Sequence, residues 1–133
     1  MIRPATPEEF PQLLDIQVRC IRDLTATYGP YENRVYIGEN DRIAGFVSWS
    51  QNKPEHVAAI ECLYTLKEHR RNGIGKLLLA EAERLISDGM TITVRSTLNA
   101  RPFYEQQGYL YKGDTVSRAG FKIALLEKAA RIE

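Results

Sequence analysis

Short apolar segments alternate along the chain with segments in which apolar residues recur every three to four positions. Runs of β-branched and aromatic residues are typical of strands, and the wider spacing is typical of an amphipathic helix. The segment 57–65 is largely apolar, which indicates a strand in the interior of a sheet. The strand-like segments are residues 2–4, 34–39, 42–50, 57–65, 90–96, 109–116 and 121–126.

Three segments carry helix signals. The first begins at Thr6-Pro7-Glu8-Glu9, where a threonine N-cap precedes a proline at the first helical position and a glutamate three residues after the cap. The second follows Gly73 and is expected to end at Gly89. The third is a short helix within residues 97–107. The expected apolar face of the second helix comprises Ile74, Leu77, Leu78, Ala82, Leu85 and Ile86.

The resulting order of elements is β-α-β-β-β-α-β-α-β-β. This order predicts an α/β (α+β) fold, because it mixes the two element types without forming a series of βαβ units. The chain has 133 residues and a mass of 15.2 kDa. This size predicts one domain that spans residues 1–133.

The composition of the chain argues against several classes of function. Eighteen Lys and Arg residues against 17 Asp and Glu give a net charge of +1, so we do not expect binding to nucleic acid through phosphate contacts. Cys20 and Cys62 lie in apolar patterns and are expected to be buried thiols. His56 and His69 lack metal-ligand spacing, and no metal site is expected. Because there is neither a signal-peptide pattern nor a membrane-spanning segment, we expect a cytoplasmic protein with no membrane partner.

The first candidate for chemistry is Arg70-Arg71-Asn72-Gly73-Ile74-Gly75-Lys76, between a predicted strand and a predicted helix. A helix start exposes unpaired backbone N–H groups and the positive end of the helix dipole. Glycines let a ligand approach these groups, so the segment suits a phosphate or pyrophosphate. It is neither a dinucleotide fingerprint nor a P-loop. The alternative is a glycine-rich turn with a basic, exposed edge.

The second candidate is Phe103-Tyr104-Glu105-Gln106-Gln107-Gly108-Tyr109, an aromatic pair on a short helix that ends at a glycine before a strand. Taken alone, this segment favours core packing of both aromatic rings, because aromatic side chains near strand ends usually pack. A functional interpretation needs support from the rest of the chain.

With Arg-x-x-Gly-x-Gly ahead of an amphipathic helix, and a strand before Phe-Tyr-Glu-x-x-Gly-Tyr, the chain resembles the GCN5-related N-acetyltransferase (GNAT) superfamily. The match runs from about Ile2 to Leu126, and the segment 60–65 fits the central strand of that family. The resemblance implies a mixed, mostly antiparallel, twisted sheet flanked by helices. It also implies an enzyme that uses acetyl-CoA as co-substrate to acetylate an amine.

The resemblance implies roles for individual residues. Tyr104 matches a tyrosine that protonates the departing CoA thiolate in many members, and Glu61 matches a position that often holds a general base, acting directly or through water. Backbone groups of the segment 71–76 would hold the pyrophosphate, and those of Leu63 and Thr65 would pair with the pantetheine arm. The implied cofactor-binding set is Leu63, Tyr64, Thr65, Arg70, Arg71, Asn72, Gly73, Ile74, Gly75, Lys76 and Asn99.

Some positions depart from the family pattern. Lys67 stands where proline is common, and Arg71 stands where glycine is common. The segment 25–33 is short for the acceptor side, which either opens that site or leaves a second subunit of a homodimer to complete it. Small-molecule amines, polyamines, amino acids, protein N-termini and lysine side chains all remain open as acceptors. The alternative functions are a non-catalytic acyl-CoA-binding or protein-interaction module and a nucleotide-phosphate module.

Overall fold

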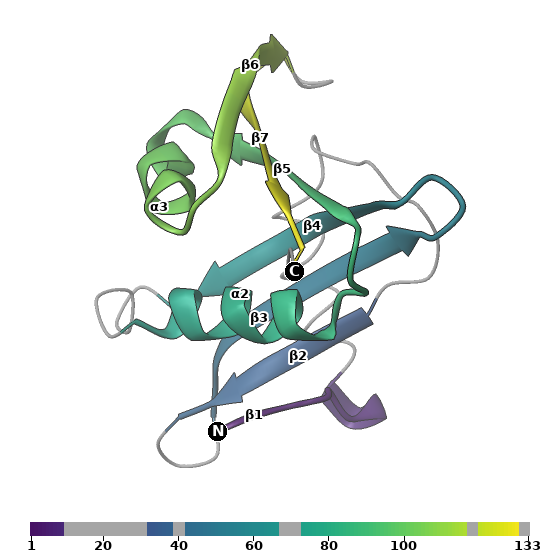
Figure 1. The fold of residues 1–133 in the computed structure, drawn as a ribbon. Helices are drawn as coiled ribbons and strands as arrows, with labels where there is room; N and C mark the ends of the chain where they lie inside the picture. Colours follow the sequence, from purple (N-terminus) through teal and green to yellow (C-terminus); the bar gives the residue numbers. More distant parts are fainter. Residues whose placement is uncertain (10–31, 39–41, 67–72, 117–119, 131–133) are drawn as a thin grey trace.

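The computed structural model describes residues 1–9, 32–38, 42–66, 73–116 and 120–130. Its strands form a seven-stranded sheet in the order β1-β2-β3-β4-β5-β7-β6 (Figure 1). The strands are β1 (Ile2–Arg3), β2 (Glu32–Ile37), β3 (Ile43–Asn52), β4 (Val57–Thr65), β5 (Thr91–Thr97), β6 (Leu110–Val116) and β7 (Lys122–Ala129). Within the described residues the helices are the 3-10 helices η1 (Pro7–Glu9) and η4 (Leu98–Ala100) and the α-helices α2 (Ile74–Leu85) and α3 (Arg101–Gln106).

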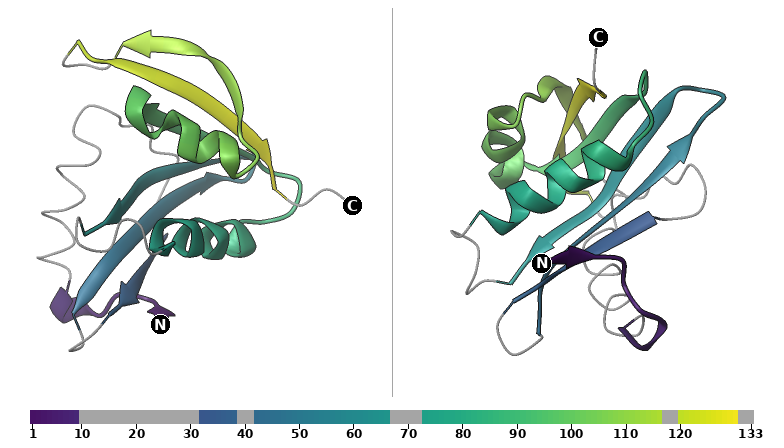
Figure 2. Two further views of the ribbon diagram at one scale, coloured as in Figure 1. Left: turned by 90° about the vertical axis from the view of Figure 1, so that its left-hand side faces the viewer. Right: turned by 60° about the horizontal axis from the view of Figure 1, so that its bottom comes forward.

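Only β4 and β5 run parallel, and the other neighbouring strands are antiparallel. The predicted mixed, mostly antiparallel sheet is therefore confirmed. The helices α2 and α3 lie against different parts of it. Two further views show α2 beside the strands β2 to β4, and α3 beside the part formed by β5, β6 and β7 (Figure 2).

Most predicted elements are present, with shifted ends. The predicted strand 57–65 agrees with β4, and α2 begins directly after Gly73 as expected. The expected end of α2 at Gly89 is wrong, because Ile86 is already extended. The prediction that Leu77 belongs to the apolar face is also wrong, because Leu77 is 50% exposed and Leu79 is buried instead. The predicted first helix beyond Glu9 lies outside the described residues.

The predicted start of the first helix is confirmed at its cap. The Thr6 backbone N–H donates to Glu9 Oε1 at 2.9 Å, which is one half of a capping box. The Arg3 guanidinium donates to both Glu9 carboxylate oxygens at 2.8 Å. The hydrogen bonds from Arg3, then the one from the Thr6 backbone, lower the pKa of Glu9 to about 2. These contacts join η1 to the first strand.

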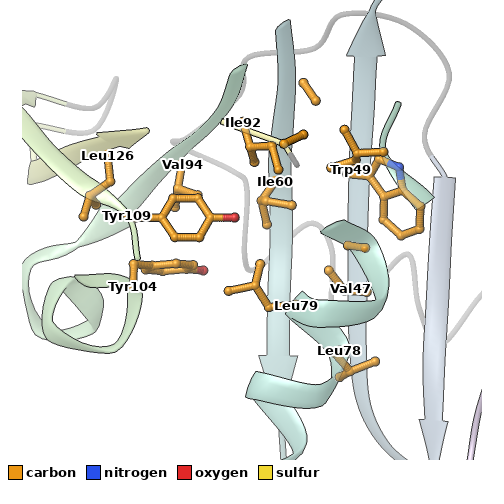
Figure 3. Packing of buried hydrophobic residues seen from close by; sticks show 14 of the residues in the cluster. Val47, Trp49, Ile60, Leu78, Leu79, Ile92, Val94, Tyr104, Tyr109 and Leu126 are labelled. Carbon is orange, nitrogen blue, oxygen red and sulfur yellow. The ribbon is translucent and has the colours of Figure 1, made fainter. Parts of the chain in front are cut away.

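Apolar side chains fill both faces of the sheet. The larger cluster lies beneath α2 and includes Trp49, Ile60, Leu78 and Ile92, which Figure 3 shows packed together. The smaller cluster lies on the opposite face and consists of Val35, Ile37, Ile43, Phe46 and Cys62. The expected burial of Cys62 is confirmed, and Cys20 lies outside the described residues. Burial of these side chains is the main term that stabilises the fold.

The sheet opens between its two central strands. β4 and β5 pair only through Val57–Ile60 and Thr91–Val94, and no further pairs between them occur among the described residues. Beyond this point β4 stays paired with β3, while β5 stays paired with β7. The two halves of the sheet therefore diverge, and the edges of both strands border the opening.

Gly45 on β3 allows α2 to lie close to the sheet. A Cβ at this position would lie 2.8 Å from Leu78 Cδ1, 2.9 Å from Ile74 Cγ2 and 3.0 Å from the Tyr64 carbonyl oxygen. These distances are below normal van der Waals contact, so any larger residue must move the helix or its side chains.

We expect Gly45→Ala to lower the free energy of unfolding by about 1–3 kcal/mol, because overpacking a close contact strains the neighbouring groups. Urea unfolding followed by circular dichroism measures the effect. Gly75→Ala is the matched control, since a Cβ there would lie 3.5 Å from its nearest neighbour, Thr65 Oγ1. Equal stability of the two variants would contradict the role of Gly45.

Candidate active site

Two cavities adjoin one another where β4 and β5 separate. The first, here called the strand cavity, has a volume of about 270 Å³. The second, here called the helix cavity, has a volume of about 450 Å³ and lies at the start of α2. The strand cavity is lined by Ile60, Glu61, Cys62, Leu63, Val94, Arg95, Ser96, Thr97, Ala100 and Tyr104. The helix cavity is lined by Leu63, Thr65, Gly73, Gly75, Lys76, Ala100, Phe103, Tyr104, Gln106 and Gln107.

Glu61 occupies a β-bulge of β4. Ser48 pairs with Cys62 while Trp49 pairs with Ile60, which leaves Glu61 as the extra residue. Such bulges are common beside active sites, where they redirect a side chain. Glu61 is 6% exposed, and its carboxylate accepts a 2.8 Å hydrogen bond from the Ser50 hydroxyl. The structure thus places a buried, hydrogen-bonded carboxylate in the wall of the strand cavity.

Tyr104 stands between the two cavities and lines both of them. It lies on α3, with Pro102 in the first turn of the helix, and its side chain is 8% exposed. Its ring packs edge-on against Phe103, at 5.1 Å between centroids, and against Tyr109, at 5.7 Å. Figure 3 shows the rings of Tyr104 and Tyr109 extending toward β4. This packing holds the tyrosine in one orientation.

The start of α2 forms one end of the helix cavity. Gly73 precedes the helix with φ +77°, a left-handed conformation that favours glycine, and as the N-cap residue it supplies no side-chain hydrogen bond to the first turn. Gly75 is half-buried and Lys76 is exposed. The first backbone N–H groups of a helix lack intrahelical partners and carry the positive end of its dipole. This end of the cavity is therefore suited to an anion.

The structure places the remaining expected cofactor residues in different surroundings. Leu63 and Thr65 line the helix cavity, whereas Tyr64 packs against the smaller apolar cluster. The side chain of Ile74 is buried in the core, and Asn99 is exposed in η4 and lines neither cavity. The expected contacts of Arg70, Arg71 and Asn72 fall outside the described residues.

Sequence reasoning missed a polar network behind Tyr104. The Tyr109 hydroxyl donates to Glu83 Oε2 on α2 at 2.7 Å. Lys128 on β7 donates to Glu83 Oε2 at 3.2 Å and to the Gln107 carbonyl oxygen at 2.7 Å. Burial, followed by the Glu83 carboxylate, raises the pKa of Tyr109 well above its usual range, so the hydroxyl remains a donor. The network joins the end of α3 to α2 and β7.

Sequence reasoning also missed Ser50, the partner of Glu61. A signal was present, because Ser48 and Ser50 are small polar residues within the otherwise apolar segment 43–50. A buried hydroxyl usually has a hydrogen-bond partner, so a serine in such a segment points to a polar group on the neighbouring strand. This holds for Ser50, whereas the buried Ser48 hydroxyl has no partner among the described residues. For the network of Tyr109 no comparable signal exists, since its members are distant in sequence.

The family model of the acetyltransferase (GNAT) domain matches residues 20–129. The chain belongs to the GNAT family. The comparison with curated protein sequences finds no match.

Solved structures share the fold of this GNAT domain at low sequence identity. An aminoglycoside 6'-N-acetyltransferase complexed with coenzyme A has a TM-score of 0.80 at 15% identity, covering 100% of this chain and 98% of that one. NAA60 of Arabidopsis thaliana, in complex with acetyl-CoA, has a TM-score of 0.73 at 14% identity, with 97% of each chain covered. The ribosomal-protein-S18-alanine N-acetyltransferase of Escherichia coli has a TM-score of 0.73 at 14% identity, covering 100% and 95%. At these identities the likeness shows the fold alone.

Within the described ranges, no cluster of three or more His, Cys, Asp or Glu residues is arranged to hold a metal ion. Of the described helices, none has the length and apolar composition needed to cross a bilayer.

The network of Tyr109 can be tested through stability. We expect Tyr109→Phe to lower the free energy of unfolding by about 1.5–3 kcal/mol, because it removes a buried hydrogen bond to a charged group. Tyr111→Phe is the matched control: its hydroxyl donates to Asp114 Oδ1 at the same 2.7 Å, but at the exposed surface. Urea unfolding of both variants measures the difference. A loss no larger for Tyr109→Phe than for Tyr111→Phe would show that the network does not stabilise the fold.

Proposed function

We propose that this GNAT domain transfers the acetyl group of acetyl-CoA directly to an amine. The observation that carries the proposal is the position of Tyr104, which lines both the cavity with the helix start and the cavity with the Glu61 carboxylate. Acetyl transfer to an amine is assisted by a base near the amine and an acid near the departing sulfur, both positioned on the bound substrates.

The residues present fit acetyl-CoA. The anion-suited start of α2, with Gly75 and Lys76, fits a pyrophosphate. Leu63 and Thr65 lie on the stretch of β4 that no longer pairs with β5, so its backbone is positioned to pair with an extended amide-containing arm. Two solved structures with this fold hold coenzyme A or acetyl-CoA, which supports the same ligand here.

The proposed reaction joins the amine nitrogen to the acetyl carbon as the carbon–sulfur bond breaks. An alkyl amine has a pKa near 10.4, so removing its proton at pH 7 costs about 4.6 kcal/mol. Glu61 accepts this proton, directly or through a water. Tyr104 donates its own proton to the sulfur as negative charge develops there. Because a thiol with a pKa of about 8.5 is a stronger acid than a phenol with a pKa of about 10, transfer to a free thiolate costs about 2 kcal/mol, so the later reprotonation of Tyr104 must draw the step forward. The nitrogen loses a second proton as the amide forms, and this proton returns Tyr104 to its neutral form. Glu61 then releases its proton to solvent.

Calorimetric titration of the full chain with acetyl-CoA is expected to show saturable binding. Lys76→Glu is expected to weaken binding about tenfold or more, because it places a negative charge at the proposed pyrophosphate position. Lys53→Glu makes the same charge change at an exposed residue that lines neither cavity, and binding should be retained. No binding at millimolar acetyl-CoA would overturn the proposed function. Binding without release of CoA on any class of amine would favour a non-catalytic module.

Tyr104→Phe is expected to lower kcat by about 100-fold or more, the usual contribution of a general acid, while the affinity for acetyl-CoA changes little. Steady-state release of CoA and calorimetry measure the two quantities separately. Tyr111→Phe, at an exposed residue on β6, is the control for loss of a tyrosine hydroxyl. Full turnover by Tyr104→Phe would remove this residue from the acid role.

A further inference from the structure

Arg95 lies on the face of β5 that points away from α2. Ile92 and Val94 belong to the apolar cluster beneath α2, and side chains alternate along a strand, so Arg95 points to the opposite face. The same reasoning applies to β4, where Ile60 belongs to the cluster beneath α2 and Cys62 belongs to the smaller cluster on the other side. Glu61 lies in the bulge beside Cys62 and is hydrogen-bonded to Ser50. We therefore place its side chain on the same face of the sheet as Cys62.

Glu61 and Arg95 are therefore neighbours across the opening. The last pair of the β4–β5 ladder is Ile60 with Val94, and Glu61 and Arg95 are the next residues on their strands. Neighbouring strands lie about 4.8 Å apart where they pair. Both side chains line the strand cavity, which has a volume of about 270 Å³. The cavity thus presents an acidic and a basic group close together.

Arg95 has no counter-ion among residues 1–9, 32–38, 42–66, 73–116 and 120–130. Its side chain is half-buried, and its Nε atom is enclosed without a hydrogen-bond partner. The part of the chain that the structure describes supplies no hydrogen bond or ion pair to it. By contrast, Arg3 and Arg84 each hold a carboxylate at 2.8 Å. Removing a guanidinium from water without a partner is costly, so a ligand with an anionic group would gain by meeting it.

We propose that Arg95 binds the carboxylate of the acceptor, and that the acceptor is a free amino acid whose amine is directed to Glu61. This inference rests on the proposed acetyl transfer. A guanidinium presents a planar fork of donors that matches a carboxylate. The phosphates of acetyl-CoA do not compete for it, because Arg95 does not line the helix cavity, where the pyrophosphate is proposed to lie.

The position of Glu61 and Arg95, directly after the last ladder pair, restricts the acceptor. An amine and a carboxylate that are separated by few bonds can reach both groups at once, as in an α-amino acid. A polyamine or a lysine side chain brings only positive charge to Arg95 and is disfavoured by repulsion. Glu61 and Arg95 together therefore favour an acceptor that carries a carboxylate as well as an amine.

The first test compares acceptors of matched shape by CoA release from acetyl-CoA. Alanine, leucine and phenylalanine are each compared with the corresponding amide and with the decarboxylated amines ethylamine, 3-methylbutylamine and phenethylamine. We expect kcat/KM to be about tenfold or more higher for at least one free acid than for its amide and its amine. An amide loses its ammonium proton more readily than the free acid, so amine basicity cannot produce this preference. A peptide with an N-terminal aspartate tests whether the carboxylate must belong to a free amino acid, and it should be the poorer substrate.

The second test uses variants of the full chain. Arg95→Gln is expected to reduce the preference for acid over amine about tenfold, and Arg95→Lys should retain part of it because the charge remains. Arg84→Gln, on the outer surface of α2, should leave the preference unchanged. Calorimetry with the N-acetylated amino acid in the presence of CoA gives a readout that needs no turnover, and Arg95→Gln should weaken this binding. Unfolding curves and acetyl-CoA affinity report whether each variant is folded.

The outcomes separate the two proposals. Equal kcat/KM for acid, amide and amine, or an unchanged preference in Arg95→Gln, would overturn the assignment of Arg95 while acetyl transfer stands. Better turnover of the aspartyl peptide than of every free amino acid would overturn the free amino acid as acceptor. Absence of both acetyl-CoA binding and CoA release with every amine would overturn the proposed function, and this inference with it.

Discussion

The short ladder between β4 and β5 is the constraint on which the site depends. Four residue pairs hold the strands together, and beyond Ile60 and Val94 each strand keeps only its outer neighbour. The backbone groups that would have completed the ladder border a cavity instead. Buried backbone groups without a partner are costly, so the opening is favourable only where a ligand or water can bond to them. The same break creates the cavity and supplies the polar groups that line it.

The two halves of the sheet are joined on the α2 side by different interactions. Beneath α2 the contact is apolar, and Gly45 lets the helix approach the strands closely. Near α3 the contact is polar, through Glu83, Tyr109 and Lys128. Tyr104 lies beside this polar contact, and its orientation follows from the packing of its neighbours. The geometry of the site therefore depends on residues that do not line the strand cavity.

Local patterns predicted much of this structure, and long-range pairings were missed. The strand 57–65 and the start of α2 after Gly73 follow from a continuous apolar run and from glycine, both of which act locally. Glu61 and Tyr104 were found through the family motifs. The pairing of Tyr109 with Glu83, the bulge at Glu61 and the unpaired state of Arg95 depend on how distant segments meet. Leu77 was misplaced because helical spacing does not show how wide a face the sheet covers.

The bulge in β4 frees one residue from the alternation of side chains that the core imposes on the rest of the strand. Residues that belong to the ladder with β3 must alternate between the two faces, so the choice of side chain at each is tied to the core on that face. Glu61 stands outside the ladder register, between Ile60 and Cys62, which keep their partners on β3. The side chain at this position can therefore change without altering which way its neighbours point. The fold has one site in its central strand where chemistry can vary while the core stays the same.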